Sequence, residues 1–100
     1  MAFTHIQKTS GAAATALDTK DFDFIVVNAS GACTVYLPTA AQNAGARKAI
    51  KRTGAGTVTV SPMAGDSAQI DGSATFSLSL ANKFVEVISD GSNWWIIGSN

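Results

Sequence analysis

The sequence predicts an all-β protein, an antiparallel β-sandwich or prism-like unit of about seven or eight short strands. Apolar and polar residues alternate with a period of two in several short segments, which is typical of strands with one buried face. Turn signals that contain glycine, such as Ser30-Gly31 and Gly54-Ala55-Gly56, separate these segments at intervals of roughly 8 to 20 residues. A chain of 100 residues fits one domain. We place this domain at residues 18–100, behind an N-terminal arm and linker at residues 1–17.

The arm is expected to hold one short strand, at residues 3–7, followed by the linker. Residues 9–15 are small and polar without periodicity, which indicates a connection rather than a regular element. His5 is the only histidine of the chain, so it predicts no metal site.

Alternation predicts the first strands of the domain. We expect strands at residues 22–27, 33–37, 57–61 and 76–80. Pro38 and Pro62 end two of them, because proline cannot donate a hydrogen bond to a ladder. After Pro38, a capping residue at Thr39, Gln42 three positions on and Gly45 together predict one short helical turn.

Four of the seven basic residues lie close together, at Arg47, Lys48, Lys51 and Arg52. This cluster has two interpretations. It can contact an acidic partner surface or a phosphate-bearing glycan, or it can be a solvated edge strand whose charges prevent aggregation, which is the commoner case. In a strand Arg47 and Lys51 share one face. These two residues are candidate ligand contacts, together with Tyr36 on the polar side of its own strand.

The last two predicted strands, residues 83–89 and 94–98, are apolar on both faces. An antiparallel domain of this size normally leaves one face in water, so we expect a second copy to cover the other. At ~25 cal/mol per Å², burying three or four such side chains contributes several kcal/mol. The expected oligomer interface consists of Phe84, Val85, Val87, Trp94, Trp95 and Ile96.

Charge and reactive side chains exclude most other classes of function. Seven basic residues balance seven acidic ones, and charged residues make up only 14% of the chain, so no nucleic-acid or membrane partner is expected. No apolar run approaches the ~20 residues of a membrane span, and we expect a soluble protein. One histidine, one buried cysteine (Cys33) and one glutamate (Glu86) leave too few combinations for catalysis. We predict no enzyme, no cofactor and no metal.

The aspartates predict turns rather than a calcium site. They lack the glycine and the bidentate glutamate of a calcium-binding loop, and aspartate side chains accept hydrogen bonds from nearby backbone N–H groups. Turn and capping roles are therefore expected for Asp18, Asp21, Asp23, Asp66 and Asp71. Asp71-Gly72 and Asp90-Gly91 are both dipeptides that favour hairpin turns.

An ordered set of segments in the domain resembles a small module of tailed-phage virion proteins. The segments lie at residues 35–38, 49–52, 54–60, 65–66, 70–74, 76–78 and 87–95. Together they are similar to a module that recurs in tail fibres, spikes, neck appendages and head fibres. The resemblance covers roughly residues 22–98.

This resemblance implies an all-β unit that forms a homotrimer in a virion assembled in the host cytoplasm, without catalysis. The protein is then a capsid decoration or head-fibre element, whose arm docks on capsid or tail proteins through Phe3, His5 and Ile6. The alternative is a carbohydrate- or receptor-binding module of a tail-fibre or spike tip, which would contact a host surface glycan through Tyr36 or one tryptophan.

Overall fold

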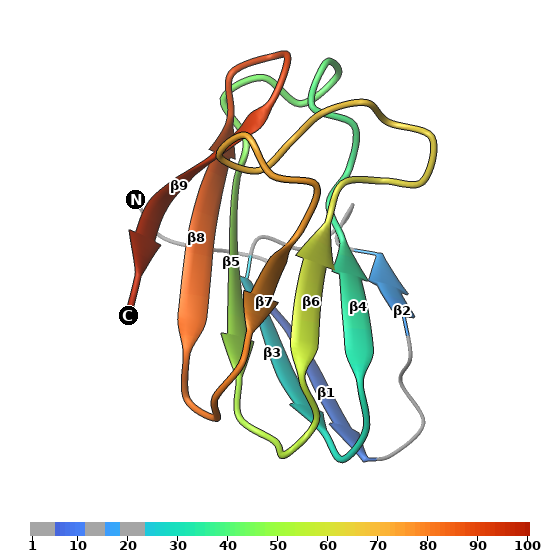
Figure 1. The fold of residues 1–100 in the computed structure, drawn as a ribbon, viewed down its shortest axis with the longest axis vertical. Coiled ribbons are helices and arrows are strands. Elements are labelled where there is room, and N and C mark those ends of the chain that lie inside the picture. The colour runs from blue at the N-terminus through green and yellow to red at the C-terminus, as the bar shows by residue number, and fades with distance from the viewer. Residues whose placement is uncertain (1–5, 12–15, 19–23) are drawn as a thin grey trace.

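The computed structural model describes residues 6–11, 16–18 and 24–100, with side chains from residue 24 onward. Within these ranges the chain forms two β-sheets that face each other and no helix, so the predicted all-β class is confirmed (Figure 1). The strands are β1 (Ile6–Gly11), β2 (Ala16–Asp18), β3 (Phe24–Ala29), β4 (Cys33–Tyr36), β5 (Arg47–Arg52), β6 (Val58–Ser61), β7 (Phe76–Leu78), β8 (Phe84–Ser89) and β9 (Trp94–Ser99). None of the described segments is a helix that could cross a membrane.

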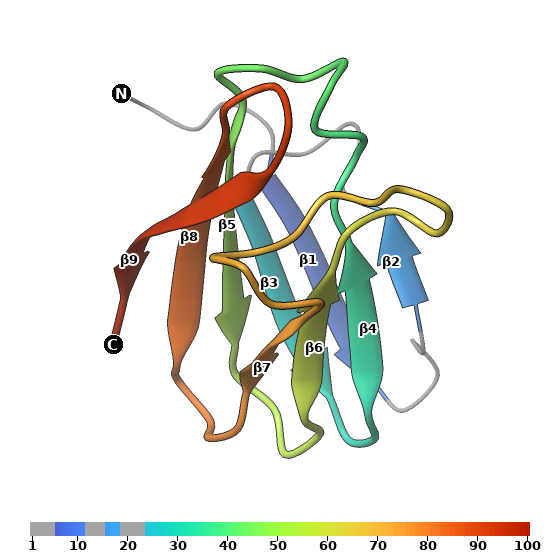
Figure 2. The ribbon, with the colours of Figure 1, turned by 45° about the horizontal axis from the view of Figure 1, so that its top comes forward.

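The chain passes back and forth between the two sheets. The five-stranded sheet has the order β1-β3-β5-β8-β9, and the four-stranded sheet has the order β2-β4-β6-β7. Figure 2 shows the two sheets as separate layers, with β9 at one side of the molecule and β2 at the other.

The first six strands repeat one structural unit three times. Ile6 pairs with Phe24 and Ala16 pairs with Thr34, so both sheets show the same offset of 18 positions. Phe24 pairs with Ala49 and Cys33 with Val58, so both sheets again share one offset, now of 25 positions. The strand pairs β1–β2, β3–β4 and β5–β6 are therefore stacked in equivalent positions. We call residues 6–18, 24–36 and 49–61 arch units, after the described arches that join the strands of the second and third.

The prediction of antiparallel strands is wrong for this part of the chain. All pairings among β1, β3 and β5 and among β2, β4 and β6 are parallel, whereas β5 with β8, β6 with β7 and β8 with β9 pair antiparallel. The reason is that each turn after β3 and β5 carries the chain to the opposite sheet rather than back along the same one. Equivalent strands of successive arch units therefore run in the same direction. Both sheets are mixed, because antiparallel strands are added to these parallel ones.

The arches stack closely because two of their residues lack a side chain. A Cβ atom on Gly54 would lie 2.5 Å from the carbonyl oxygen of Ala29, and one on Gly56 would overlap the backbone of Gly31. The backbone N–H of Gly56 instead donates a hydrogen bond of 2.8 Å to the carbonyl of Ala29. The predicted turn at residues 54–56 is thus confirmed, and its glycines permit close backbone contact.

The core lies between the two sheets and contains the inward side chains of both. Its largest fully buried members are Trp94, Ile25, Leu37, Ile50, Ile70, Val27, Val35, Val58, Val60, Val85 and Val87. Each strand from β3 to β6 alternates buried and less buried residues as predicted, apart from the almost wholly buried middle of β5. The loop residues Ala40, Ala68 and Ile70 close one end of this core.

β5 is a central strand, so the interpretation of the basic cluster as an edge strand is wrong. It lies between β3 and β8, and two of its basic residues, Lys48 and Arg52, are buried. Backbone carbonyls solvate the Arg52 guanidinium: it donates hydrogen bonds to Leu78, Gly54 and Ala55 at 2.9, 3.0 and 2.6 Å. A buried cation is tolerated here because its donors are satisfied.

Residues 38–46 form turns, and the predicted helical turn is absent. Thr39 Oγ1 lies 3.2 Å from Gln42 Oε1, and the Asn43 N–H donates to the Ala40 carbonyl in a turn. Gly45 has a φ of 84°, as expected for a closing residue. Ser89 explains the difference, because it hydrogen-bonds the carbonyl of Ala40 and the N–H of Gly45 and so draws this segment onto the core.

The described part of the first 18 residues contributes edge strands to both sheets. β1 pairs with β3 along six residues, so residues 9–11, predicted as linker, belong to a strand. β2 pairs with β4 at residues 16–18. Phe3 and His5 lie outside the described residues, and Ile6 begins β1 opposite Phe24. The division at residue 17 and the docking role of the arm stay predictions.

Candidate functional site

Three of the six predicted interface residues cannot contact a partner. Val85, Val87 and Trp94 are fully buried within their own chain. The prediction treated β8 and β9 as apolar on both faces, but the four-stranded sheet already covers one of these faces. The Trp94 indole N–H has no hydrogen-bond partner among the described residues, which is the remaining cost of placing it in the core.

The other three predicted interface residues are accessible to different degrees. Trp95 is 43% exposed, whereas Phe84 and Ile96 are half-buried. Ile96 packs against the edge of the core, so it presents only part of its surface. The prediction missed Ile97, which is 49% exposed, because a register shift between Glu86 and Val87 leaves it as the extra residue of a β-bulge. The residue pattern of this segment does not predict the position of the bulge.

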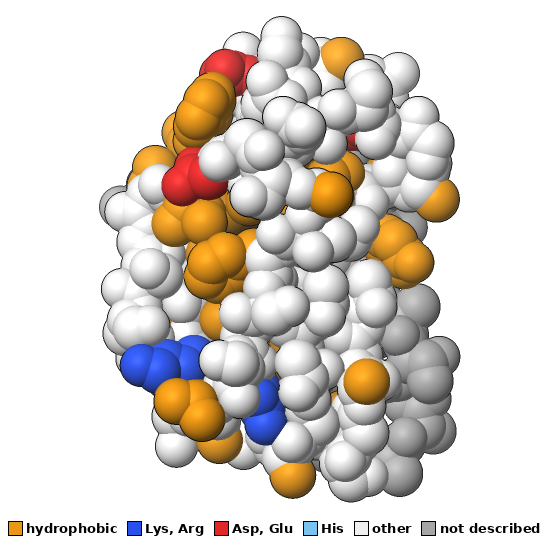
Figure 3. All heavy atoms as spheres, viewed as in Figure 1, with side chains coloured by type: hydrophobic (Ala, Val, Ile, Leu, Met, Phe, Trp, Pro, Cys, Tyr) orange, Lys and Arg blue, Asp and Glu red, His pale blue; other side chains and the backbone are white. Residues whose placement is uncertain are grey.

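The outer face of the five-stranded sheet is aromatic. Phe24, Ala49, Phe84, Ile88 and Trp95 share this face, which we call the aromatic face, because each alternates with a core residue in its strand. Figure 3 shows the adjoining side of the molecule, where hydrophobic side chains gather over β9 and β8.

The aromatic face is hollowed where small Ala49 lies between two phenylalanines. This hollow has a volume of about 310 Å³ and is lined by Phe24, Ala49, Lys51, Phe84 and Glu86. Glu86 accepts a hydrogen bond of 2.8 Å from Arg47 Nη2 in an ion pair, and Lys51 Nζ donates one of 3.0 Å to the Asn82 carbonyl. Two of the predicted ligand contacts, Arg47 and Lys51, are thus engaged with their own chain.

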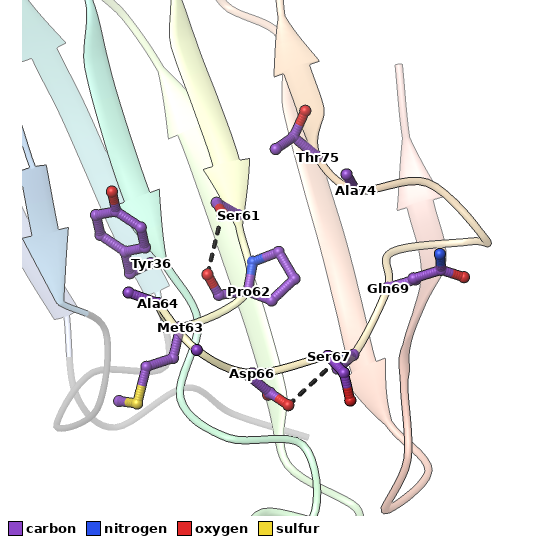
Figure 4. A pocket seen from close by; sticks show the side chains of 12 residues that line it. Tyr36, Ser61, Pro62, Met63, Ala64, Asp66, Ser67, Gln69, Ala74 and Thr75 are labelled. Carbon is purple, nitrogen blue, oxygen red and sulfur yellow. Dashed lines mark hydrogen bonds between the residues drawn. The ribbon is translucent and has the colours of Figure 1, made fainter.

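The outer face of the four-stranded sheet is polar and carries a second, larger depression. It consists mainly of hydroxyl side chains, including Thr34, Thr59 and Ser77, which alternate with core residues. At one end of β4 and β6 a groove of about 470 Å³ lies under the loop that leads to β7, as Figure 4 shows. We call it the Tyr36 groove. It is lined by Tyr36, Ser61, Pro62, Met63, Ala64, Gly65, Asp66, Ser67, Ala68, Gln69, Ala74 and Thr75.

Hydrogen bonds hold the loop that forms the groove in one position. Asp66 accepts bonds from the backbone N–H groups of Ala40 and Ala68, each at 3.2 Å. The backbone of Gln69 donates to Asn93 Oδ1 at 2.9 Å and accepts from the Trp94 N–H at 2.8 Å. The loop is therefore anchored to the core on both sides of Ser67, and the shape of the groove is preformed.

The three predicted ligand contacts do not form one site. Tyr36 lines the groove on the four-stranded sheet, whereas Arg47 and Lys51 lie on the opposite face of the molecule. The prediction missed Ser67, Gln69 and Thr75, because loop residues show no periodicity. The available signal was Ile70, an apolar residue between the turn motifs at 64–66 and 71–72, which indicates that the loop folds back onto the core.

The predicted turn roles are confirmed for the aspartates whose side chains are described. Asp66 caps its loop as above, and Asp71 accepts a bond of 2.8 Å from the Ile96 N–H. Asp71 and Gly72 both have positive φ in a tight turn closed by Ile70 and Ser73. The side chains of Asp18, Asp21 and Asp23 lie outside the described ones.

The Asp90-Gly91 turn joins β8 to β9, as predicted for a hairpin dipeptide. Asp90 accepts hydrogen bonds from the N–H groups of Ser92 and Asn93 and from the Trp95 indole, each at 2.8 Å. The bonds from Asn93, from Trp95 and from Ser92 lower the pKa of the Asp90 carboxyl. The Trp95 ring is thereby fixed against the hairpin.

Reactive groups are scarce in the described part of the chain. No cluster of three histidine, cysteine or acidic side chains that could hold a metal occurs there. Burial raises the pKa of the Cys33 thiol, which disfavours the reactive thiolate.

Comparisons with known proteins add no relative. No family model matches the chain, and no curated protein matches it either.

Proposed function

We propose that this protein is a non-catalytic structural component of a tailed-phage virion, a capsid decoration or head-fibre element that acts as a homotrimer. The order of segments at residues 22–98 that resembles the virion module supports the viral setting. The stacked arch units support a mechanical role, since strands joined by short arches and paired on both sheets form a stiff unit without disulfides.

One observation carries the assembly: the edge strand β9 leaves large apolar side chains in water. Trp95, on the aromatic face, is 43% exposed, and Ile97, the extra residue of the bulge, is 49% exposed. The hollow beside Phe84 offers a concave apolar surface on the aromatic face. Neighbouring exposed and concave apolar surfaces are typical of protein–protein contacts. We propose that copies of the chain meet through Trp95, Ile97 and Phe84.

The proposed absence of catalysis rests on the chemistry of the described residues. Cys33 is buried with a raised thiol pKa, and the sole glutamate, Glu86, is paired with Arg47. Paired acids or a nucleophile with an adjacent base would be needed for the common hydrolytic mechanisms.

The test of assembly is the mass in solution. Light scattering after gel filtration is expected to give three chains per particle at micromolar concentration. The double variant Trp95→Asp, Ile97→Asp is expected to be monomeric while keeping the far-ultraviolet circular dichroism of the parent, because it places charges in the contact but not in the core. Thr59→Asp on the opposite face is the matched control and is expected to leave the trimer intact. A monomeric parent protein, or a trimer that survives the double variant, contradicts the proposal.

We further propose that the arm attaches the trimer to capsid or tail proteins through Phe3, His5 and Ile6. Removal of all 17 residues would not test this attachment, because residues 6–11 and 16–17 supply strands to both sheets. A truncation confined to residues 2–5 leaves every described strand in place.

A second candidate function is receptor binding to a host surface glycan at a fibre or spike tip. The specific observation that favours it is the Tyr36 groove, a concave surface with one aromatic wall and several hydroxyl and amide groups.

A further inference from the structure

We propose that the Tyr36 groove binds a neutral saccharide. The inference deepens the second candidate function and rests on it, and it is independent of the proposed trimer contact, which lies on the other sheet. It follows from four properties of the groove: its shape, its unused polar groups, its charge and its fixed geometry.

The groove combines an apolar wall with a size suited to one or two sugar rings. Its volume of about 470 Å³ falls within the ~300–1,000 Å³ typical of small-molecule sites. Tyr36 forms one wall, and buried Pro62 and Ala68 provide apolar surface beside it. In Figure 4 the Tyr36 ring lies across the groove from Ala74 and Thr75. A tyrosine offers an apolar ring and a polar edge, which matches the C–H and O–H groups of a pyranose.

Three polar side chains of the groove lining have no partner in the described part of the chain. The side chains of Ser67, Gln69 and Thr75 are exposed and make no hydrogen bond within the described residues. Hydroxyl groups both donate and accept, and the Gln69 amide does each with a different atom. A ligand rich in hydroxyl groups, which also donate and accept, matches the chemistry of these side chains.

Charge selects against anionic ligands. Among the described residues that line the groove there is no lysine or arginine, and the one carboxylic acid among them, Asp66, has both carboxylate oxygens bonded to backbone N–H groups. Phosphates, nucleic acids and acidic sugars need cationic partners for strong binding. A neutral saccharide needs none.

The groove is preorganised, so binding orders little of the protein. Asp66 and the backbone of Gln69 tie the loop to residues 40, 93 and 94. Preorganisation improves affinity because fewer side chains and loops lose freedom on binding.

The experiment is a nuclear magnetic resonance titration of the isotope-labelled full chain with glucose, galactose, N-acetylglucosamine and lactose. At least one of these sugars is expected to give saturable amide shifts that centre on Ser67, Gln69 and Thr75. Sodium phosphate and N-acetylneuraminic acid, at the same concentrations, are expected to give none there. Saturable shifts from phosphate that equal those from the sugars would identify an anion site and overturn the proposal.

Substitutions test the role of the aromatic wall. Tyr36→Ala is expected to weaken the sugar affinity about tenfold, whereas Tyr36→Phe keeps the ring and most of the affinity. Thr59→Ala, on the same outer face but outside the groove, is the matched control and is expected to change nothing. No saturable shift with any of the four sugars, or shifts that Tyr36→Ala leaves unchanged, would overturn the proposal. If the chain binds a sugar but is monomeric in solution, the proposed trimer is contradicted and the proposed saccharide site is not.

Discussion

The arch units and the C-terminal antiparallel strands are stabilised in different ways. In β1 to β6, successive units stack in constant register, and their turns touch backbone to backbone at Gly54 and Gly56. In β7 to β9, aspartate side chains satisfy the backbone of the turns and of the last strand, as Asp71 does for Ile96. Close contact between arches thus depends on glycines, which have no side chain, whereas the turns of the antiparallel half depend on hydrogen bonds to aspartate side chains. Three substitutions test this contrast.

The largest effect is expected from Gly56→Ala. Its added methyl group would overlap the backbone of Gly31, which cannot move without displacing the neighbouring arch. We expect a loss of roughly 3 kcal/mol in the free energy of unfolding, measured by urea denaturation. Gly31→Ala is the matched control, because its added Cβ meets no atom within 4 Å, and we expect a change of about 0.5 kcal/mol or less. Equal effects of the two substitutions would show that the arches do not depend on close backbone contact.

A smaller effect is expected from Asp71→Ala in the antiparallel half. This change removes the acceptor of the Ile96 N–H and places alanine at a φ of 50°. The expected loss is about 2 kcal/mol in the same denaturation experiment. Asp71→Asn keeps an acceptor oxygen and tolerates positive φ, so it is expected to retain most of the stability. If asparagine is as harmful as alanine, the side-chain hydrogen bond is not the cause.

The smallest effect is expected at Asp90, and it depends on pH. Its carboxyl pKa is lowered in the folded chain below the ordinary value of 3.8. The carboxylate therefore contributes stability that is fully present above pH 3.8 and is lost as the pH falls through the lower folded value. The difference in melting temperature between the parent and Asp90→Asn is expected to shrink over that range.

Trp95→Phe provides the control for Asp90, because it removes one of the hydrogen bonds that lower the pKa. The Asp90 pKa, followed by nuclear magnetic resonance, is expected to rise part of the way toward its ordinary value. A melting-temperature difference that stays constant with pH would contradict the assigned role of the carboxylate.

Much of the antiparallel half follows from the sequence, because its signals are local. Asp71-Gly72 and Asp90-Gly91 predict their turns, and both turns occur. The parallel pairing of the arch units could not be predicted in this way. Alternation predicts which face of a strand is buried, but it does not show whether the chain after Ala29 turns back or crosses to the other sheet.

Charge and burial conflict in β5, which explains the error there. Basic residues usually mark an exposed strand, yet Arg52 reaches three carbonyl oxygens from a buried position. Those acceptors come from loops and from β7, so the strand alone does not reveal them. The Tyr36 groove is similar: the outward direction of Tyr36 is predictable, but Ser67, Gln69 and Thr75 approach it only through the closure of a loop.

The constant length of the arch units has a consequence for how this protein can diversify. Each unit spans 13 residues, and the offset grows from 18 to 25 positions only because the connection after the second unit is longer. Both described arches lie at one end of the sandwich, and the long connections, including the groove loop, lie at the other (Figure 1). A residue inserted at that second end would lengthen a connection without changing the register of the strands. Chains built on this scaffold could therefore differ in the surface formed by these loops while their sheets stay superimposable.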